Sequence, residues 1–209
     1  HPGFSEQDPL GWRAAMIDTL AQLWRQGVDP ARIKGIAFTA GAHTHVLEEA
    51  DGTILRPAIM WNDQRSGRQA AALRESDGAR ILELSGNQAS PTWTLPQLVW
   101  VRENEPELFA RIRRIRPAKD WLRRQIDGSD ATDITDAWGM MLADARSPEG
   151  AWSDELCRIA GIDPSVLPPL VGSSDITGAV TADAAAATGL VAGTPVICGT
   201  SDTNAETFC

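Results

Sequence analysis

The chain has 209 residues, which is enough for one large domain or two small ones, each with its own core. Its apolar content of 43% and charged content of 22% are ordinary for a soluble globular protein, and no apolar run approaches the length of a bilayer-spanning helix. The formal net charge of −9 disfavours a nucleic acid polymer or an acidic membrane as partner, because binding to phosphate backbones relies on Lys and Arg.

The first predicted helix begins at Asp8-Pro9, an N-cap residue followed by a proline at the first helical position. Apolar residues recur every four positions from Trp12 to Trp24, and Gly27 provides a stop signal. The segment that follows, residues 33–39, is predicted to be a buried strand.

A hairpin is predicted where Asp51-Gly52 separates the apolar runs 46–49 and 54–55. Residues 58–61 form the next predicted strand, which ends in the polar segment 62–65.

The middle of the chain is predicted to be mostly helical. The predicted helices are 66–84, 95–102, 105–112 and 120–126, the last capped by Asp120 and stopped by Gly128. Residues 131–144 are ambiguous, because their apolar residues fit no single period. Two short helices are predicted after them, at 152–159 and 163–167.

The last part of the chain is predicted to alternate strand and helix. It contains a strand at 178–180, a helix at 182–188 capped by Thr181 and stopped by Gly189, and a strand at 195–198. That strand leads into the polar segment 199–202. Mixed strands and helices, without a linker between domains, place the chain in the α/β or α+β class.

The cysteines and the first residues of the chain bear on its environment. Cys157, Cys198 and Cys209 are odd in number and have no CxxC spacing, which argues against a disulfide framework or a zinc site. Residues 1–5 have neither the basic start nor the apolar stretch of a secretion signal. We therefore expect a cytoplasmic protein.

Polar residues follow three of the predicted strands, at the position where open α/β sheets bind ligands. In the first segment, residues 39–45, small residues allow close approach of the backbone, and His43 is placed to hydrogen-bond a sugar hydroxyl. The alternative is a Gly-containing turn with exposed histidines. His43 and His45 have metal-ligand spacing, but the only other histidine is His1 and no cysteine is near, so no metal site is expected.

The second segment is Trp61-Asn62-Asp63-Gln64-Arg65. Trp61 beside Asn62, Asp63 and Arg65 is suited to a sugar platform, with ring stacking below and hydrogen bonds around the rim. The alternative is that Trp61 is buried at the end of a strand and that Asp63 caps the next helix.

The third segment carries Asp202 on a Gly/Ser loop after an apolar strand. A carboxylate there is suited to accept a proton from an attacking hydroxyl. The alternative is that Asp202 or Thr203 simply caps a following helix.

Two further carboxylates, Asp133 and Asp136, lie three residues apart, which invites comparison with the acid pair of a glycosidase. Such a pair must face across a substrate, and these two come from one short segment, so we expect structural or rim residues. The scattered tryptophans are predicted to pack in the core: Trp93, Trp100, Trp121, Trp138 and Trp152.

Taken in order, the sequence blocks resemble the FGGY family of carbohydrate kinases, nearest to its xylulose kinases. The run GIAFTAGAHTHVLEEADGTILRPAIMWNDQRS is similar to the family's strand, hairpin and "RPAILWND.R" stretch. RPAKDWLRRQIDG resembles a later block, with Ala118 where the family's "PKD" usually has proline. ATDITDAWGMMLAD looks like the "SDxSDAxGTxLxD" segment, and TPVICGTSDTNA occupies the place of "VPVxxGGGDNxxG".

This resemblance implies the actin-like, ribonuclease H-like α/β fold of sugar kinases, a mixed sheet flanked by helices, in which two such domains clamp ATP and sugar. It implies that ATP and Mg²⁺ are used and that the γ-phosphate goes to a small sugar, most simply a ketopentose such as D-xylulose. The expected partners are therefore the sugar and ATP. A second copy of the chain, in a homodimer, is a further candidate partner.

Individual residues take expected roles from the same resemblance. Asp202 falls on the family's catalytic base, and His43 falls on the histidine of the "GQMHG" sugar-binding segment of the xylulose kinases. The other implied substrate-binding residues are Ala42, Trp61, Asp63 and Thr203.

The chain departs from the family pattern at two points near these residues. "GQMHG" is replaced by residues 40–44, AGAHT, so its glutamine and methionine are lost. "GGGDN" becomes residues 199–203, GTSDT, with Thr203 where an asparagine usually contacts the sugar. Both changes concern substrate selection, so another ketose or a polyol remains open.

The resemblance also bears on domain organisation. We expect residues 1–209 to form most of the N-terminal sugar-binding domain of a longer enzyme, inactive alone. An opening phosphate-binding hairpin with a "DxGT" motif is expected before His1, and a nucleotide-binding domain after Cys209. The alternatives are a catalytically silent actin-like sensor of a sugar or nucleotide and, more distantly, a glycosidase.

Overall fold

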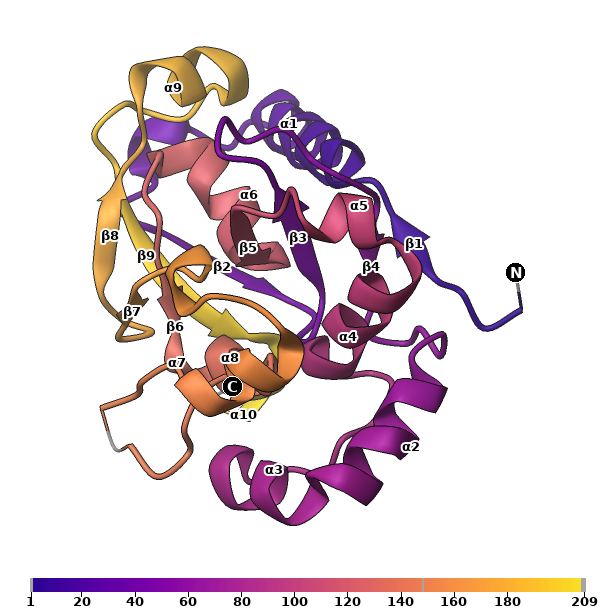
Figure 1. Cartoon of the computed structure of the whole chain (residues 1–209). Coiled ribbons are helices and arrows are strands. Elements are labelled where there is room, and N and C mark those ends of the chain that lie inside the picture. Colours follow the sequence, from indigo (N-terminus) through magenta and orange to yellow (C-terminus); the bar gives the residue numbers. More distant parts are fainter. Residues whose placement is uncertain (1, 148, 208–209) are drawn as a thin grey trace.

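Strands from distant parts of the chain form three small sheets in the computed structural model (Figure 1). The structure describes residues 2–147 and 149–207. Within that part, an antiparallel sheet has the order β1 (Glu6–Gln7), β4 (Ala58–Ile59), β3 (His45–Glu48), β5 (Arg114–Pro117). A second sheet has the order β2 (Ile36–Ala40), β9 (Pro195–Ser201), β8 (Ile176–Ala179), and a two-stranded third sheet pairs β6 (Thr132–Asp133) with β7 (Leu170–Val171).

Helices surround these sheets. They are α1 (Pro9–Arg25), α2 (Gly67–Ser76), α3 (Gly78–Ser85), α4 (Thr94–Asn104), α5 (Pro106–Phe109), α6 (Ala118–Asp127), α7 (Ile134–Gly139), α8 (Asp154–Ala160), α9 (Ala182–Thr188) and α10 (Asp202–Thr207). Two 3₁₀ turns, η1 (Pro30–Arg32) and η2 (Pro164–Val166), complete the described elements. The mixed α/β composition agrees with the predicted fold class.

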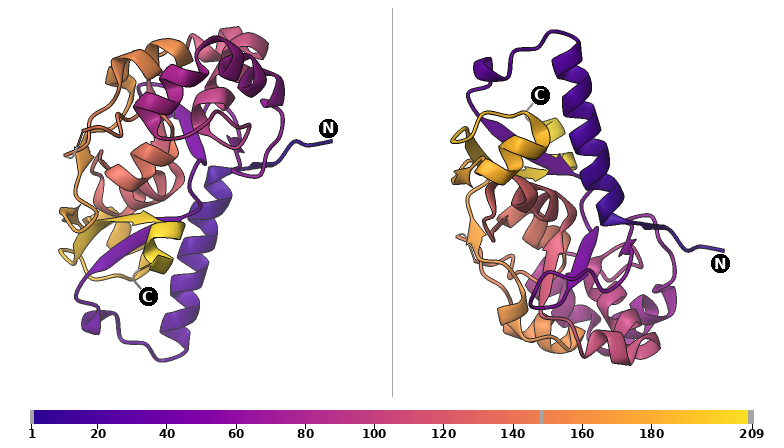
Figure 2. Two further views of the ribbon diagram at one scale, coloured as in Figure 1. Left: turned by 90° about the horizontal axis from the view of Figure 1, so that it is seen from below. Right: turned by 90° about the horizontal axis from the view of Figure 1, so that it is seen from above.

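Helix α1 confirms the first predicted helix. The Asp8 carboxylate accepts a hydrogen bond from the backbone N–H of Leu10, and Pro9 occupies the first turn. Met16, Leu20 and Trp24 pack against the apolar core beside β2 and β9. Figure 2 shows this helix along one side of the molecule, next to the second sheet.

Helix α6 lies between the two larger sheets and contacts strands of both (Figure 1). Its side chains are mostly buried, and it ends at Gly128, whose φ of 72° allows the left-handed C-cap. The prediction that Asp120 caps this helix is wrong. The helix begins at Ala118, so Asp120 lies within its first turn.

The predicted helix at 66–84 is wrong in one respect: it is broken into α2 and α3 at Asp77. Asp77 has φ −128° and ψ 9°, and the neighbouring Ser76 and Gly78 are poor helix formers. The predicted helix at 105–112 also stops early, at Phe109.

The predicted strands differ from the observed ones mainly in length. The second arm of the Asp51-Gly52 hairpin is reduced to a single bridge between Glu48 and Ile54, because β3 pairs instead with β4 and β5. Strand β9 continues to Ser201, beyond the predicted end at residue 198. Strand β2 is only half-buried, with alternate residues exposed, so the prediction of a buried strand is wrong for this part of the chain.

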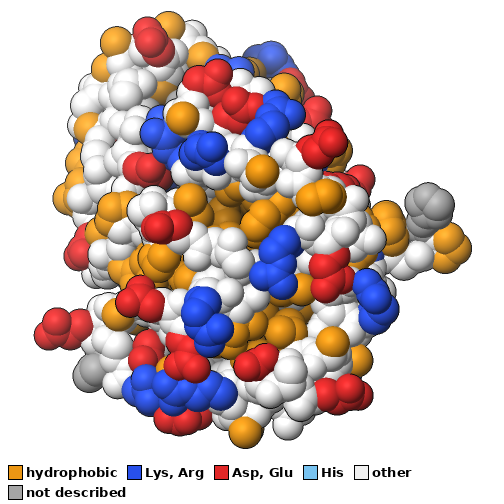
Figure 3. Space-filling model, in the orientation of Figure 1, with side chains coloured by type: hydrophobic (Ala, Val, Ile, Leu, Met, Phe, Trp, Pro, Cys, Tyr) orange, Lys and Arg blue, Asp and Glu red, His pale blue; other side chains and the backbone are white. Residues whose placement is uncertain are grey.

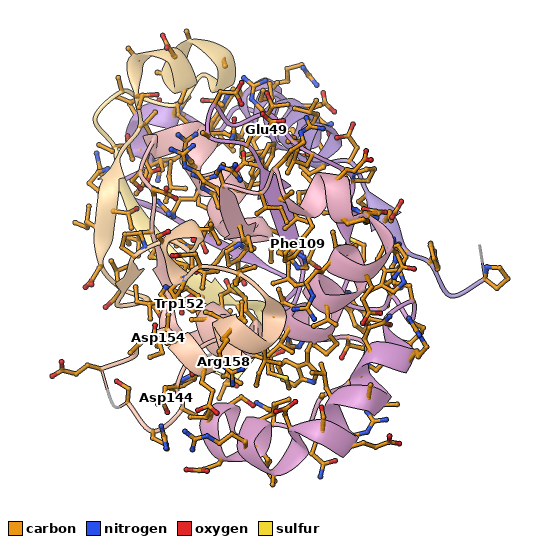
Figure 4. The ribbon with its side chains drawn as sticks, viewed as in Figure 1. Glu49, Phe109, Asp144, Trp152, Asp154 and Arg158 are labelled. Carbon is orange, nitrogen blue, oxygen red and sulfur yellow. The ribbon has the colours of Figure 1, made fainter. Side chains whose placement is uncertain are left out.

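The buried apolar side chains of the described residues form three clusters, of which two are extensive. The larger lies among α2, α3, α4, α8 and the strands β3 and β5, and the smaller lies between α1, α9 and the second sheet. Trp93, Trp100 and Trp152 pack on the larger cluster and Trp121 is buried in a third one, as predicted, whereas Trp138 is exposed. Trp152, labelled in Figure 4 at the start of α8, donates its indole N–H to the carbonyl of Pro168 at 2.8 Å.

Acidic and basic side chains are interspersed on the face shown in Figure 3. Ion pairs among the described residues include Arg80 with Glu83 and Glu155, and Arg146 with Asp144. In the described residues, no helix is long and apolar enough to cross a membrane.

Candidate active site

The parallel pair β2–β9 brings two distant segments to one place. Ala40 lies opposite Ser201 in the register, so the chain leaves both strands at the same edge, at Gly41 and at Asp202. The carboxyl ends of parallel strands are the usual ligand-binding edge of an α/β sheet. Two of the three predicted polar segments therefore meet here.

A β-bulge in β9 changes the direction in which this strand ends beside β2. The β2–β9 register shifts between Ala37 and Thr39, and Gly199 in the bulged strand has φ 80°. A Cβ built on Gly199 would lie 1.8 Å from the carbonyl oxygen of Phe38, so only glycine fits. The bulge redirects the end of β9 and with it Asp202.

Asp202 is the first residue of α10 and lies at the wall of a pocket of about 490 Å³. Its Oδ1 accepts hydrogen bonds from the backbone N–H of Thr203 at 2.8 Å and of Ala42 at 3.4 Å. Its Oδ2 accepts no hydrogen bond from the described residues and lies near Gly41, where a built Cβ would be 3.7 Å away. One oxygen is thus fixed and the other faces the pocket.

Trp61 also lies next to Gly41. Its Cδ1 would be 3.4 Å from a Cβ at that position, and the side chain is 53% exposed. The alternative that Trp61 is buried at the end of a strand is therefore wrong. The indole and the Asp202 carboxylate form two sides of the pocket, with Trp12 of α1 and Leu122 of α6 as apolar walls.

His43 lies in the turn between β2 and β3 with φ 66°, in the left-handed region that non-glycine residues rarely adopt. Its Nδ1 is 2.5 Å from the carbonyl oxygen of Gly139, and its ring packs at 4.2 Å from that of Trp93. Burial lowers the pKa of His43, opposed in part by this hydrogen bond and by the charge of Asp202.

The hydrogen bond to Gly139 assigns the tautomer of His43. A carbonyl oxygen can only accept, so Nδ1 carries the proton, and in the neutral ring Nε2 is left as an acceptor. The side chain can therefore accept a hydrogen bond from a hydroxyl group. His43 packs on the α7 side of the turn, and the residues that line the pocket belong to its other side.

Asp63 is placed differently from the expectation for a rim residue. It is fully buried, and its oxygens accept from the backbone N–H groups of Ser5 and Arg65 and from the Arg65 guanidinium. It does not cap α2, whose N-cap is Ser66. Asp63 therefore holds the N-terminal segment against the Trp61 loop, outside the pocket.

The remaining candidate residues frame the Asp202 carboxylate. Ala42 and Thr203 contribute their backbone N–H groups to it, and the side chain of Thr203 is exposed. Neither offers a long side chain to the pocket.

Two functional candidates escaped the reasoning from sequence. Thr44 is only 4% exposed, lines the pocket, and accepts a hydrogen bond from the backbone N–H of Trp61 at 3.2 Å, so it holds the Trp61 backbone beside the pocket. Thr135 of α7 contacts the residues just before Asp202. The replacement of the last glycine of "GQMHG" by Thr44 was an available signal for the first, and the position of Thr135 on the second serine of "SDxSDAxGTxLxD" was one for the other.

The acid pair Asp133 and Asp136 does not face a cleft. Both carboxylates are buried around the ammonium of Lys119, at 3.1 and 3.2 Å, together with Asp120 at 2.8 Å. This arrangement overturns the glycosidase alternative for this pair, since two such acids must lie across a substrate. The prediction of structural residues agrees with it.

The pocket suits a polyol better than a nucleotide. Its described lining contains no Lys or Arg that could hold phosphate groups, and Asp202 is its one carboxylate. In residues 2–147 and 149–207, no group of three or more His, Cys, Asp or Glu could hold a metal ion. These residues therefore do not fit ATP with Mg²⁺ by themselves, and the phosphates require groups from elsewhere.

Comparison with known proteins places the chain in a family. A model of the N-terminal domain of the FGGY family of carbohydrate kinases matches residues 1–209. The chain is 36% identical over 201 residues to a xylulose kinase of Bacillus subtilis and 34% identical over 202 residues to one of Escherichia coli. These alignments cover 96% and 97% of the chain, but only 40% and 41% of the two relatives.

Solved structures agree with the sequence matches. The structure of a xylulose kinase from Rhodospirillum rubrum superposes with a TM-score of 0.93 at 32% identity, over 99% of this chain and 43% of that one. A kinase from Brucella ovis gives 0.87 at 36% identity, over 98% and 42%. The fold is thus that of the mixed α/β, actin-like domains of sugar kinases. The chain belongs to the FGGY family of carbohydrate kinases and corresponds to its N-terminal domain.

Proposed function

We propose that this chain is the sugar-binding part of an ATP-dependent kinase of a small ketose, D-xylulose in the first place, with Asp202 as general base. The observation that supports it best is the geometry of Asp202: one oxygen is held by backbone N–H groups, and the other faces the pocket beside Trp61. The similarity to xylulose kinases supports the choice of sugar.

In the proposed reaction, Asp202 Oδ2 accepts the proton of the sugar hydroxyl that attacks the γ-phosphate of ATP. The sugar oxygen–phosphorus bond forms as the bond between phosphorus and the departing ADP oxygen breaks. Because this transition state is largely dissociative, the proton moves late, and a carboxylate can accept it at that stage. Its main task is to orient the hydroxyl.

The other residues would select and hold the sugar. The Trp61 indole offers an apolar face for the C–H groups of a sugar in the pocket. His43 lies on the α7 side of the turn, so its Nε2 would accept a hydrogen bond only from a hydroxyl of a sugar that extends past the turn. Because Ala42 stands where the family motif has methionine, the proposal also allows substrates other than D-xylulose.

The extent of the enzyme is part of the proposal. The chain spans about 40% of the length of the curated relatives it matches, so the complete activity is assigned to a protein of their length that contains it. We propose that residues 1–209 form most of its sugar-binding domain, that the remainder supplies the groups for ATP and Mg²⁺, and that it works in the cytoplasm.

The test is an ADP-release assay of this full-length protein against ketopentoses, ketohexoses and polyols. We expect turnover with at least one of them, fastest with a ketopentose. The variant Asp202→Asn is expected to lose roughly 10²- to 10⁴-fold in kcat with little change in sugar affinity, because a general base is removed without loss of volume. Asp183→Asn, at an exposed acid of α9 outside the pocket, serves as the matched control.

Turnover of Asp202→Asn at the unmutated rate would remove Asp202 from the role of base. Failure of every sugar, together with saturable sugar or nucleotide binding by calorimetry, would support a catalytically silent sensor instead.

A further inference from the structure

The two residues that precede Asp202 are attached to α7 through a single hydroxyl group. The backbone N–H of Ser201 donates to Thr135 Oγ1 at 3.1 Å, and Thr200 Oγ1 lies 2.8 Å from the same atom. Thr135 thereby contacts the end of β9 directly beside the carboxylate that faces the pocket.

The direction of these hydrogen bonds follows from counting protons. Thr135 Oγ1 lies 2.6 Å from Asp133 Oδ2, a carboxylate oxygen that can only accept. The Thr135 hydroxyl therefore donates its single proton to Asp133. Thr200 Oγ1–H and Ser201 N–H must both donate to Thr135, so all three groups have fixed orientations.

Asp133 itself is firmly anchored. It is fully buried, receives the Ser173 hydroxyl at 2.7 Å on Oδ2, and lies 3.1 Å from the Lys119 ammonium on Oδ1. Burial alone would raise the pKa of the Asp133 carboxyl, but Lys119 and the hydrogen bonds from Thr135 and Ser173 outweigh it and hold the pKa below its ordinary value. The acceptor that orients Thr135 is thus a charged carboxylate.

Part of the connection uses side chains that the family pattern does not have. Where that pattern reads "GGGD", this chain has Thr200 and Ser201, and glycine could not supply the Thr200 hydroxyl. Ser201 Oγ in turn accepts from the Asn204 side chain at 2.8 Å, which ties β9 to the first turn of α10. The segment around Asp202 is therefore held from both sides.

We propose that Thr135 is a positioning residue for the phosphoryl transfer proposed above. Oriented by Asp133, its hydroxyl holds Thr200 and Ser201 and so determines where Asp202 Oδ2 points. The inference rests on the proposed function, in which Asp202 is the base. A displacement of about 1 Å at such a group is enough to cost on the order of 100-fold in rate.

The test compares Thr135→Val with Thr135→Ser in the full-length protein. Valine keeps the shape of threonine and removes the hydroxyl, and we expect kcat to fall roughly 10- to 100-fold with an unchanged KM for the sugar. Serine keeps the hydroxyl and is expected to restore kcat to within about threefold of the unmutated value.

Thr188→Val is the matched control. Thr188 is a buried threonine of α9 whose hydroxyl donates to the Ala184 carbonyl at 2.6 Å, outside the pocket. An equal loss of kcat in Thr188→Val and Thr135→Val would show that both act only through stability. Unchanged kcat in Thr135→Val, or no recovery in Thr135→Ser, would overturn the proposal.

A second measurement keeps this inference separate from the proposed function. Amide hydrogen exchange at Ser201 is expected to be faster in Thr135→Val than in the unmutated chain and unchanged in Thr135→Ser, since only valine removes the acceptor of that N–H. If no sugar is phosphorylated, the proposed function fails, and the exchange at Ser201 alone decides whether Thr135 holds this segment. Unchanged exchange in Thr135→Val would refute that as well.

Discussion

His45 is a fully buried histidine in β3, and neither of its ring nitrogens has a hydrogen-bond partner in the described structure. Burial lowers the pKa of His45 to about 4, from an ordinary value of 6.5. The ring is therefore neutral in the folded protein throughout the physiological range. A neutral ring avoids placing an uncompensated charge in the sheet.

This burial predicts a loss of stability in mild acid. The unfolded chain binds a proton at His45 below pH 6.5 and the folded chain does so only near pH 4, so stability is fully present above 6.5 and is lost as the pH falls between these values. From pH 7.5 to 5, urea unfolding should show a contribution of about 2 kcal/mol from this residue. His45→Leu should lose that part of the pH dependence. An identical slope in both proteins would contradict the prediction.

Among individual residues, the sequence predicted the pocket residues that directly follow a strand. It did not predict the residues whose contacts are with segments far away in the sequence. Asp202 and Trp61 follow apolar strands directly, so their exposure at a sheet edge could be anticipated. Thr135 and Ser201 are 66 positions apart in the sequence, and the periodicity of apolar residues gives no information on such a contact. Asp63 was misplaced because its partner Ser5 lies 58 residues away.

Among the elements, those with a strong local signal were predicted well. In helix α9 the Thr181 side chain accepts a hydrogen bond from the backbone N–H of Ala184, and Gly189 adopts the left-handed conformation at the C-terminus. Both capping residues were predicted from the sequence. The break at Asp77 and the limited pairing of the Asp51-Gly52 hairpin were not predicted, because tertiary partners decide them. Boundaries within such segments depend on packing more than on propensity.

The bulge in β9 yields a prediction for a single glycine. Gly199→Ala should destabilise the protein by roughly 3 kcal/mol or more, because the added Cβ would overlap the Phe38 carbonyl and φ 80° is unfavourable for alanine. Gly193→Ala is the control, since Gly193 has φ 86° and open space around its Cβ position. It should cost about 1 kcal/mol, from the backbone alone. Equal losses by thermal unfolding would exclude the overlap.

The buried charges around Lys119 link parts of the whole molecule. This ammonium from α6 reaches Asp133 at the end of β6 and Asp136 in α7, and Arg123 of the same helix bonds Asp127 at 2.6 Å. Burial, together with the like charges of Asp120 and Asp133, raises the pKa of Asp136 to about 7, although Lys119 opposes the shift. Arg123 also lies 3.4 Å from Asp120, so two cations face four buried carboxylates in this cluster.

Removal of this cation should be among the most damaging single changes in the chain. Lys119→Met is expected to lower the free energy of unfolding by about 3–5 kcal/mol at pH 7.5, because buried carboxylates lose their counterion. The chain's only other lysine, Lys34, is exposed, and Lys34→Met should change stability by less than about 0.5 kcal/mol. Urea unfolding of both variants checks this, and a loss common to both would argue against the buried cluster as the cause.

The parallel pairing of β2 with β9 also sets the order in which the protein can fold. Ala42 and Asp202, which meet at the pocket, are separated by 160 residues, so the pocket cannot exist until β9 has been synthesised. Before then β2 (Ile36–Ala40) has no β9 to pair with, so its backbone is unpaired and its apolar side chains are not covered. Contacts of such long sequence separation form slowly, and unpaired apolar strands associate with other chains. We therefore expect chains truncated before Pro195 to aggregate during expression, and folding of the intact chain to benefit from a chaperone that shields β2.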